Sequence, residues 1–336
     1  MTRNVTVADI ARAAGVSMMT VSRVINHKGE VSAATRQRVQ KIIDRLSYRP
    51  SGIARSLATR HSGTIGLVIP DVSNPFFADV ARGAEHVACA EGYNIFLCNT
   101  EEDQQRELDV VHSLEEKRVD GVVLFSRLGP RQLFGVLKHQ PAAVLINRQT
   151  SKKNNTPAIG TVRLDDVLGG QLVIRHLLDR GHQAIGFLAG PPTSHSGRAR
   201  SKGYHQTLTE AGLSPNPLWK HHCAPTVEGG YAAAHDLLSA QPELTALFCF
   251  NDLVAVGALQ ACAELGRSVP LDLAIAGYDD IPLAALVTPP LTTCRTPRYE
   301  LGAEAVHLLL NRIRGCDDPC KEVILQPQLI IRASAP

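Results

Sequence analysis

Apolar residues in the first 50 positions recur at helical spacing in three short segments. Thr6, followed three residues later by Asp9, resembles the capping box that opens a helix, and Gly15 then breaks that helix. Ser17 is placed to cap a second helix, and Pro50 stops a third. Helix, short glycine turn and helix is the spacing of a helix-turn-helix unit, although small helical hairpins are also common packing units. The three apolar faces are Val7, Ile10, Ala11 and Ala14, then Val21, Val24 and Ile25, and then Val39, Ile42, Ile43 and Leu46.

From Ser62 onward, short and almost continuous apolar runs alternate with helical stretches such as Phe76–Glu91 and Gly169–Arg180. This alternation predicts parallel sheets that are covered by helices on both faces. The number of runs suits an α/β core of two doubly wound lobes, with a ligand cleft at the carboxyl ends of the strands. The expected strands are Ile65–Pro70, Tyr93–Asn99, Gly121–Phe125, Ala143–Asn147, Ala184–Gly190, Leu247–Asn251 and Leu273–Tyr278.

Charge is concentrated at the amino-terminal end. Residues 1–60 contain eleven Lys and Arg against three Asp and Glu, a net charge of +8, so the remaining residues carry −5 of the total of +3. A basic head on a mildly acidic body is the electrostatic pattern of a nucleic-acid-binding protein. A solvated basic face would give the same count, so charge alone does not decide between them.

Several classes of protein and site are disfavoured. The chain has no run of about 18 apolar residues and no apolar signal segment at its start, so we expect a cytoplasmic protein without a membrane partner. Neither the pair Cys316 and Cys320 nor the cluster His221–Cys223 has zinc-site spacing, and we expect no metal and no cofactor. No nucleotide-binding, Walker, nucleophile-elbow or H-E-x-x-H motif is found, so we expect no enzyme. A free-standing sugar-binding protein is the second alternative, after an enzyme. It would need a signal peptide and would lack the basic head.

Four segments of the head form a recognisable set: VADIA at 7–11, GVSMMTVSRVIN at 15–26, YRP at 48–50 and ARSL at 54–57. Together they resemble the amino-terminal signature of the LacI family of transcription regulators. In that family the second helix enters the major groove of an operator half-site. The resemblance implies a helix-turn-helix DNA-binding domain over residues 1–50.

The family's base-reading positions fall on Met18, Met19 and Arg23 of this chain. Arg23 is able to donate two hydrogen bonds to a guanine edge. The two methionines offer only apolar contact, for example with a thymine methyl group, and methionine at helical spacing is otherwise a core residue. The expected phosphate contacts, which position the head without reading sequence, are Thr6, Ser17, Thr20, Ser22 and Asn26.

Residues 51–60 are short and moderately prone to form a helix, and an isolated helix of this length is marginal in water. A plain linker is one interpretation. The family resemblance implies instead a hinge helix that pairs with its copy in the minor groove, where Leu57 wedges into the central base step and Arg55 also contacts DNA.

The body, residues 61–336, resembles the periplasmic sugar-binding-protein fold as it occurs in this family, with the ribose-repressor branch nearest in pattern. The stretches KRVDG at 117–121, GYDD at 277–280 and TPPLTT at 288–293 belong to the resemblance, which covers essentially the whole chain. It implies an effector-binding and dimerisation domain of two lobes, with the chain crossing between them near 160 and 290.

Polar and aromatic residues at the strand ends are the effector-binding candidates. The resemblance implies that Asn74 bonds a sugar hydroxyl and that Phe76, Phe77 or both stack on the sugar, although at least one phenylalanine is expected in the core. It also implies that two arginines fork onto sugar hydroxyls, a geometry that guanidinium groups favour. Some of these residues have the alternative role of capping the following helix. The full set is Asn74, Phe76, Phe77, Arg148, Arg198, Asn251 and Asp279, with Asp165 and Arg127 as secondary candidates.

Two positions depart from the family pattern. Asn147 stands where the family often carries an aspartate, and Pro225 stands where ribose and purine binders place an aromatic wall. We therefore expect a sugar, sugar acid or sugar phosphate as the effector, with ribose and purines disfavoured. The remaining expected partners are a second copy of the chain, in a homodimer, and a pseudo-palindromic operator DNA, because two-fold protein symmetry matches half-site symmetry.

Overall fold

The computed structural model describes residues 5–25, 29, 31–48, 61–148, 159–316 and 322–336. The chain forms two compact units, residues 1–62 and residues 63–336. No helix among the described residues is long and apolar enough to cross a membrane.

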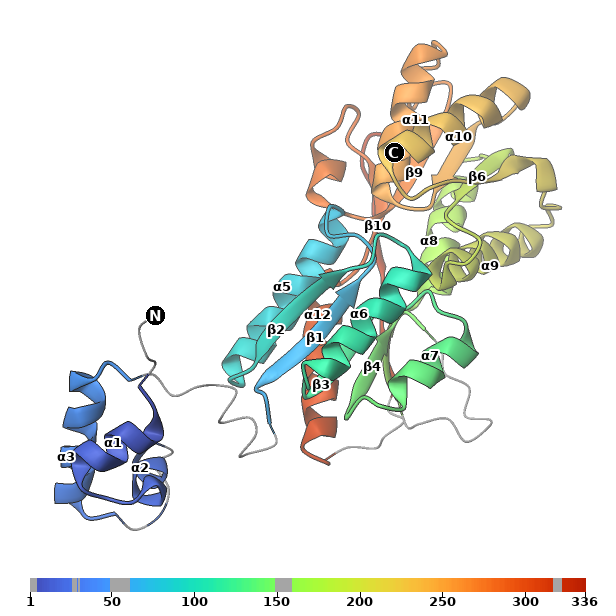
Figure 1. Ribbon diagram of the computed structural model, residues 1–336. Coiled ribbons are helices and arrows are strands. Elements are labelled where there is room, and N and C mark those ends of the chain that lie inside the picture. The colour runs from blue at the N-terminus through green and yellow to red at the C-terminus, as the bar shows by residue number, and fades with distance from the viewer. Residues whose placement is uncertain (1–4, 26–28, 30, 49–60, 149–158, 317–321) are drawn as a thin grey trace. The chain divides into compact units, whose positions relative to one another are not determined.

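The described residues of the smaller unit form a head of three helices (Figure 1). It contains α1 (Val7–Ala14), α2 (Met18–Ile25) and α3 (Ala33–Arg45). The predicted capping box is confirmed: Thr6 Oγ1 accepts from the Asp9 amide at 3.3 Å, and the Thr6 amide donates to Asp9 Oδ2 at 3.0 Å. Gly15 ends α1 with φ +64°, a left-handed conformation that glycine adopts without strain. The buried core of the head is Ile10, Ala11, Ala14, Val21, Val24, Val39 and Ile42.

The larger unit begins with a lobe built on a six-stranded parallel sheet of order β11-β5-β4-β3-β1-β2. One face of the sheet packs on α5 and α12, and the other packs on α6 and α7 (Figure 1). The strands are β1 (Thr64–Ile69), β2 (Asn94–Asn99), β3 (Gly121–Leu124), β4 (Ala143–Ile146), β5 (Gly160–Leu164) and β11 (Glu322–Leu325). The helices are α5 (Pro75–Ala90), α6 (Gln104–Glu116), α7 (Pro130–Leu137) and α12 (Arg298–Ile313).

The second lobe has a sheet of order β12-β10-β9-β8-β6-β7, parallel except that β12 runs antiparallel to β10. Helices α10 and α11 cover one face, and α8 and α9 cover the other. The strands are β6 (Ile185–Ala189), β7 (Lys220–His222), β8 (Ala246–Cys249), β9 (Ala274–Asp279), β10 (Thr292–Arg295) and β12 (Gln328–Ile330). The helices are α8 (Asp166–Asp179), α9 (His195–Glu210), α10 (Val227–Ala240) and α11 (Asp252–Glu264), with short 3₁₀ turns at Pro217–Trp219 and Pro282–Ala285.

Within the described residues, the chain passes between the lobes from β5 to α8, from β10 to α12, and from β11 to β12. The sequence predicted passages near 160 and 290, and the third was missed. All seven expected strands are present with ends shifted by at most two residues, but β5, β7, β10, β11 and β12 were also missed. These five strands are three to five residues long, and several are polar, so their patterns carry little signal.

Candidate DNA-reading helix and effector cleft

Helix α2 places the predicted base-reading side chains on the surface of the head. Ser17 Oγ accepts from the Thr20 amide at 3.1 Å and so caps the start of the helix. Met18 and Met19 follow immediately and are 59% and 65% exposed, whereas Val21 is fully buried. The alternative of core methionines is therefore wrong for this unit.

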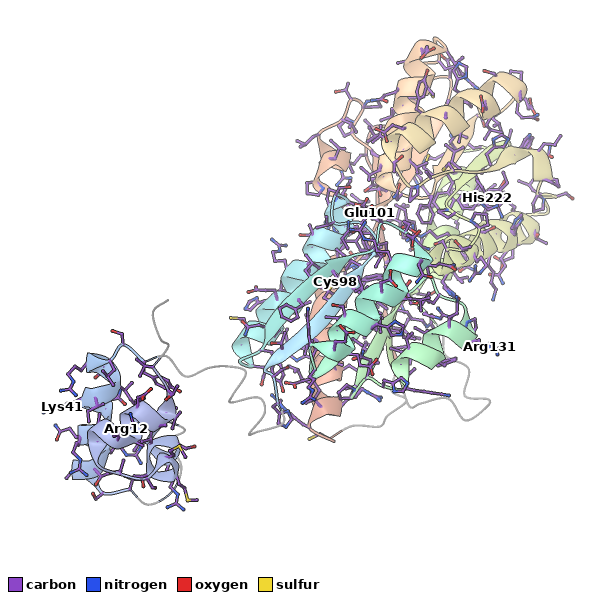
Figure 2. The ribbon with its side chains drawn as sticks, in the orientation of Figure 1. Arg12, Lys41, Cys98, Glu101, Arg131 and His222 are labelled. Carbon is purple, nitrogen blue, oxygen red and sulfur yellow. The ribbon has the colours of Figure 1, made fainter. Side chains whose placement is uncertain are left out.

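The other predicted DNA contacts in the head are surface residues too. Arg23 and Ser22 are exposed on the same helix, Thr20 is half-buried, and Thr6 is exposed at the start of α1. Arg12 and Lys41, labelled in Figure 2, are further cationic residues of this unit. The predictions for Asn26, Arg55 and Leu57 lie outside the described residues.

A cavity of about 530 Å³ lies between the two lobes of the larger unit. Its wall is formed by the loops that follow the strands of both sheets, as expected for doubly wound lobes. From the first lobe the wall includes Pro70, Asp71, Asn74, Phe76, Phe77, Glu101, Glu102, Phe125, Ser126, Arg127, Ile146 and Asn147. From the second it includes Pro191, Thr193, Ser194, His195, Ser196, Arg200, Ala224, Pro225, Thr226, Phe250, Asn251 and Asp279.

The first-lobe wall is aromatic. The ring of Phe77 lies edge-on to Phe76 and Phe125, with centroids 5.0 and 5.1 Å away. Phe76 is buried and packs in the core, while Phe77 is half-buried, so one of the pair is a core residue as expected. Asn74 caps α5, its Oδ1 accepting from the Phe76 amide at 2.9 Å, and it also lines the cavity. The capping and the effector-facing interpretations of this residue are therefore compatible.

The second-lobe floor of the cavity holds a buried ion cluster around Arg200. Its Nε donates to Asp166 Oδ1 at 2.9 Å, and its Nη2 lies 3.7 Å from Asp279 Oδ1. Its guanidinium carbon stacks 3.6 Å from the ring centroid of Tyr278. Burial raises the pKa of Asp279 to about 7, an effect that Arg200 opposes and Asp166 reinforces. The cluster thus offers a fixed guanidinium and a carboxyl group that is able to donate or accept a hydrogen bond.

Asn251 and Pro225 meet in the same wall. Asn251 Oδ1 accepts from the Val254 amide at 2.9 Å, capping α11, and its Nδ2 donates to the Pro225 carbonyl at 3.3 Å. Both residues line the cavity, so no aromatic side chain stands at position 225 to stack on a ligand. Asn147, in the opposite wall, adopts φ +52° and accepts from the Leu164 amide at 2.9 Å through Oδ1.

The two predicted effector arginines, Arg148 and Arg198, are not wall residues of the cavity. Arg198 is exposed and donates to the Pro192 carbonyl and to His195 Nδ1, each at 3.0 Å. Arg148 is 5% exposed and donates to the Leu128 carbonyl at 2.6 Å. The arginine in the second-lobe wall is Arg200, two residues after the predicted Arg198 on the same helix.

Of the two secondary candidates, Arg127 and Asp165, one lines the cavity and the other does not. Arg127 lines the cavity and pairs with Glu102, Nη2 to Oε2 at 2.7 Å. Asp165 instead caps α8, accepting from the Leu168 amide at 3.1 Å, and is not among the wall residues. Among the described residues, no group of three His, Cys, Asp or Glu side chains is arranged to hold a metal ion.

The chain matches two family models and many known regulators. Residues 6–51 match the model "Bacterial regulatory proteins, lacI family", and residues 174–335 match "Periplasmic binding protein-like domain". The HTH-type transcriptional repressor PurR of Photobacterium profundum is 34% identical over 329 residues, 98% of each chain. The ribose operon repressor of Haemophilus influenzae is 37% identical over 329 residues, again 98% of each chain.

Among solved structures, the lac repressor dimer bound to operator and the anti-inducer ONPF matches 99% of both chains with a TM-score of 0.88 and 29% identity. The similarity therefore extends through the head and both lobes rather than one module. The chain belongs to the LacI family of bacterial regulatory proteins.

Proposed function

We propose that this protein is a sequence-specific transcription regulator, acting as a repressor, whose operator affinity is controlled by a sugar-like effector in the cleft. The observation that carries the proposal is the combination, in one chain, of an exposed α2 surface on a basic head and an effector-sized cavity between two lobes. The repressors with which the chain aligns over its full length support the same role. We propose no catalytic activity, and place the protein in the cytoplasm because its ligand is chromosomal DNA.

In the proposed complex, α2 lies in the major groove of each half-site. Recognition helices read bases with their first residues, and here those are the exposed Met18 and Met19, one turn before Arg23. Thr6, Ser17, Thr20, Ser22 and Asn26 contact phosphates, and Arg55 and Leu57 act in the minor groove. A homodimer presents two such heads to a pseudo-palindromic operator.

The effector binds among Asn74, Phe77, Asn251, Asp279 and Arg200, where both lobes supply side chains to one cavity. A ligand that contacts both lobes stabilises one relative arrangement of them over the other. It changes operator affinity only to the extent that it binds the two arrangements with different affinity.

The test is a gel-shift titration with DNA from upstream of the protein's own gene, at several salt concentrations. We expect specific binding whose affinity falls steeply with salt, because phosphate neutralisation releases counterions. Binding to no DNA at any salt concentration would leave a sugar-binding protein as the better description. The control is a scrambled duplex of the same composition.

Replacing Arg23 with alanine is expected to relax the base preference at one position of each half-site, at a cost of about 1–3 kcal/mol. The residue is exposed on α2 and outside the head core, so the fold of the head is unaffected. The measurement is binding to a library of operators with single substitutions. An equal loss on every operator would instead identify Arg23 as a phosphate contact.

Replacing Leu57 with alanine is expected to weaken operator binding by roughly tenfold or more while leaving effector affinity unchanged, because a wedge in the minor groove stabilises the bent duplex. Operator affinity from gel shifts and effector affinity from calorimetry are measured on the same preparation. Leu218→Ala, the same change at an exposed leucine outside the head, is the matched control. Unchanged operator affinity in Leu57→Ala would show that the segment is a plain linker.

A further inference from the structure

A hydrogen-bonded bridge centred on Arg298 joins the two lobes of the larger unit. Arg298 is the first residue of α12, directly after the chain has passed over from β10. Its Nη1 donates to the main-chain carbonyl of Asp279, at the end of β9 in the second lobe. Its Nε and Nη2 lie 3.0 and 2.9 Å from Asp79 Oδ2 on α5, in the first lobe. One guanidinium group therefore holds a main-chain atom of one lobe and a carboxylate of the other.

Each end of this bridge belongs to an element that forms a wall of the cavity. Asp279 is itself a wall residue, and Asp79 lies on α5, whose first turn supplies two phenylalanines of the opposite wall. Helices α5 and α12 pack closely against each other (Figure 1). A Cβ atom at Gly83 would lie only 2.0 Å from the Tyr299 carbonyl oxygen, so the two backbones are in direct contact. We therefore expect α5 and the start of α12 to move together.

The second-lobe end of the bridge is a turn that its neighbours hold in an unusual conformation. Asp279 and Asp280 have φ values of +105° and +55°, a region that residues with a side chain occupy only when the surrounding structure imposes it. The Asp280 carboxylate accepts from Arg295 Nε at 2.6 Å and from Arg332 Nη2 at 2.7 Å. Arg298 holds the Asp279 carbonyl. A ligand that displaces Asp279 consequently acts on the bonds that hold this turn.

The first-lobe end of the bridge is a carboxylate shared by two arginines. Asp79 Oδ1 lies 3.1 Å from Arg82 Nη2, three residues later on the same helix, while Oδ2 takes Arg298. The Arg82 side chain is 69% exposed, whereas that of Arg298 is 14% exposed. Hydrogen bonds between charged groups are stronger where water is excluded. The Asp79–Arg298 pair is therefore the stronger of the two, and Arg82 offers a control within the same cluster.

The lobes also meet through apolar side chains. Ile281 of the second lobe is buried in the first-lobe core, and Leu253 and Leu283 pack against that core. Apolar contacts are non-directional, so they tolerate a small rotation or slide of one lobe on the other. The hydrogen bonds of Arg298 weaken steeply when their geometry changes. The Arg298 bridge is therefore more sensitive to the relative arrangement of the lobes than the apolar contact is.

We propose that Arg298 is a positioning residue that couples the effector-binding floor of the cleft to the first lobe. A ligand that moves Asp279 either moves α5 with it or breaks the Arg298–Asp79 pair, and both events change which arrangement of the lobes is favoured. Arg298 does not bind the effector itself, since it is not among the wall residues of the cavity. This inference rests on the proposed function, because it names the residue through which the effector response of that function passes.

Operator DNA is the probe, so the test does not depend on the identity of the effector. Coupling between two binding sites is reciprocal, and DNA binding must therefore alter the cleft floor if an effector there alters operator affinity. Hydrogen–deuterium exchange of the full-length protein is followed by mass spectrometry at residues 277–283, with and without the duplex from upstream of its own gene. We expect DNA to change the exchange rate there by about fivefold or more, the lower end of ordinary allosteric coupling.

Two variants break the bridge from opposite lobes. Arg298→Gln is expected to bind the duplex but to lose the DNA-induced change in exchange. Asp79→Asn, which leaves Arg298 in place, is expected to lose it as well, and it carries the test if Arg298→Gln does not fold. The double variant should lose nothing more, because both substitutions remove one interaction. Arg82→Gln, which removes the exposed partner of Asp79, is expected to keep the wild-type change.

The DNA-induced change separates coupling from a purely structural role. If Arg298 only supported the fold, its loss would raise exchange with and without DNA and leave the difference between them intact. Survival of that difference in both bridge variants, or its absence in the wild type, would overturn the proposal. A protein that binds no duplex would contradict the proposed function instead. The DNA-free comparison then decides the inference: Asp79→Asn should still raise exchange at 277–283, in the other lobe, and unchanged exchange would show that the bridge does not couple the lobes.

Discussion

Replacing Arg200 with alanine is expected to destabilise the larger unit by about 3–5 kcal/mol and to abolish the effector response. The guanidinium is 4% exposed and bonds Asp166 while lying 3.7 Å from Asp279. Removing it leaves two buried carboxyl groups without their common cation. It also removes the stacking on Tyr278 and the bond that Arg200 donates to the Phe250 carbonyl. Fold and cleft therefore depend on the same side chain.

Urea unfolding followed by circular dichroism measures the stability, and calorimetry with an effector measures binding. Arg198→Ala is the matched comparison, because it removes an arginine two residues away on α9 whose side chain is exposed. We expect its cost in stability to stay below about 1 kcal/mol, as for other surface substitutions. Equal stability of Arg200→Ala and Arg198→Ala would show that the buried ion cluster around Arg200 does not stabilise the larger unit.

Arg198 was predicted to face the cleft, but the residue that lines it is Arg200. The difference shows what the sequence leaves undetermined. Both lie on α9, and residues two apart on a helix point to different sides. The helix is polar along much of its length, so its apolar pattern does not reveal which face is buried. Arg200 is buried because Asp166 and Asp279, from other elements, meet it there. Only the tertiary arrangement supplies that information.

Where a segment is long or its burial is strongly one-sided, the sequence was a good guide. The apolar pattern around Met18 and Met19 already assigned the core to Val21 and Val24, and the exposure of both methionines agrees with it. The seven strongly apolar strands were also found. The missed strands include Lys220–His222, whose pairing with β6 is decided by its neighbours rather than its own residues.

Replacing Asp279 with asparagine is expected to remove much of the pH dependence of stability that this carboxyl group causes. Its folded-state pKa of about 7 lies above the ordinary value of 3.8, mainly because the group is buried. The folded state thus prefers the protonated form, and this contribution is complete below about pH 4 and lost as the pH rises through about 7. An amide stays neutral throughout. Relative to that of the wild type, the free energy of unfolding of the variant should increase by on the order of 2–4 kcal/mol as the pH rises from about 4 to about 8.

The measurement is urea unfolding of both proteins at matched ionic strength across that pH range. Asp252 lies in the same buried cluster with a raised pKa, caused first by burial and then by Asp279, and is present in both proteins. The difference between the two stability curves therefore reports the ionisation of Asp279. It also includes the change in the pKa of Asp252 that follows when the Asp279 charge is removed. Parallel curves would mean that Asp279 is ionised in the folded protein across the whole range. In that case Asp279 would be a carboxylate at every pH tested. It would then bind a sugar only by accepting hydrogen bonds from hydroxyl groups.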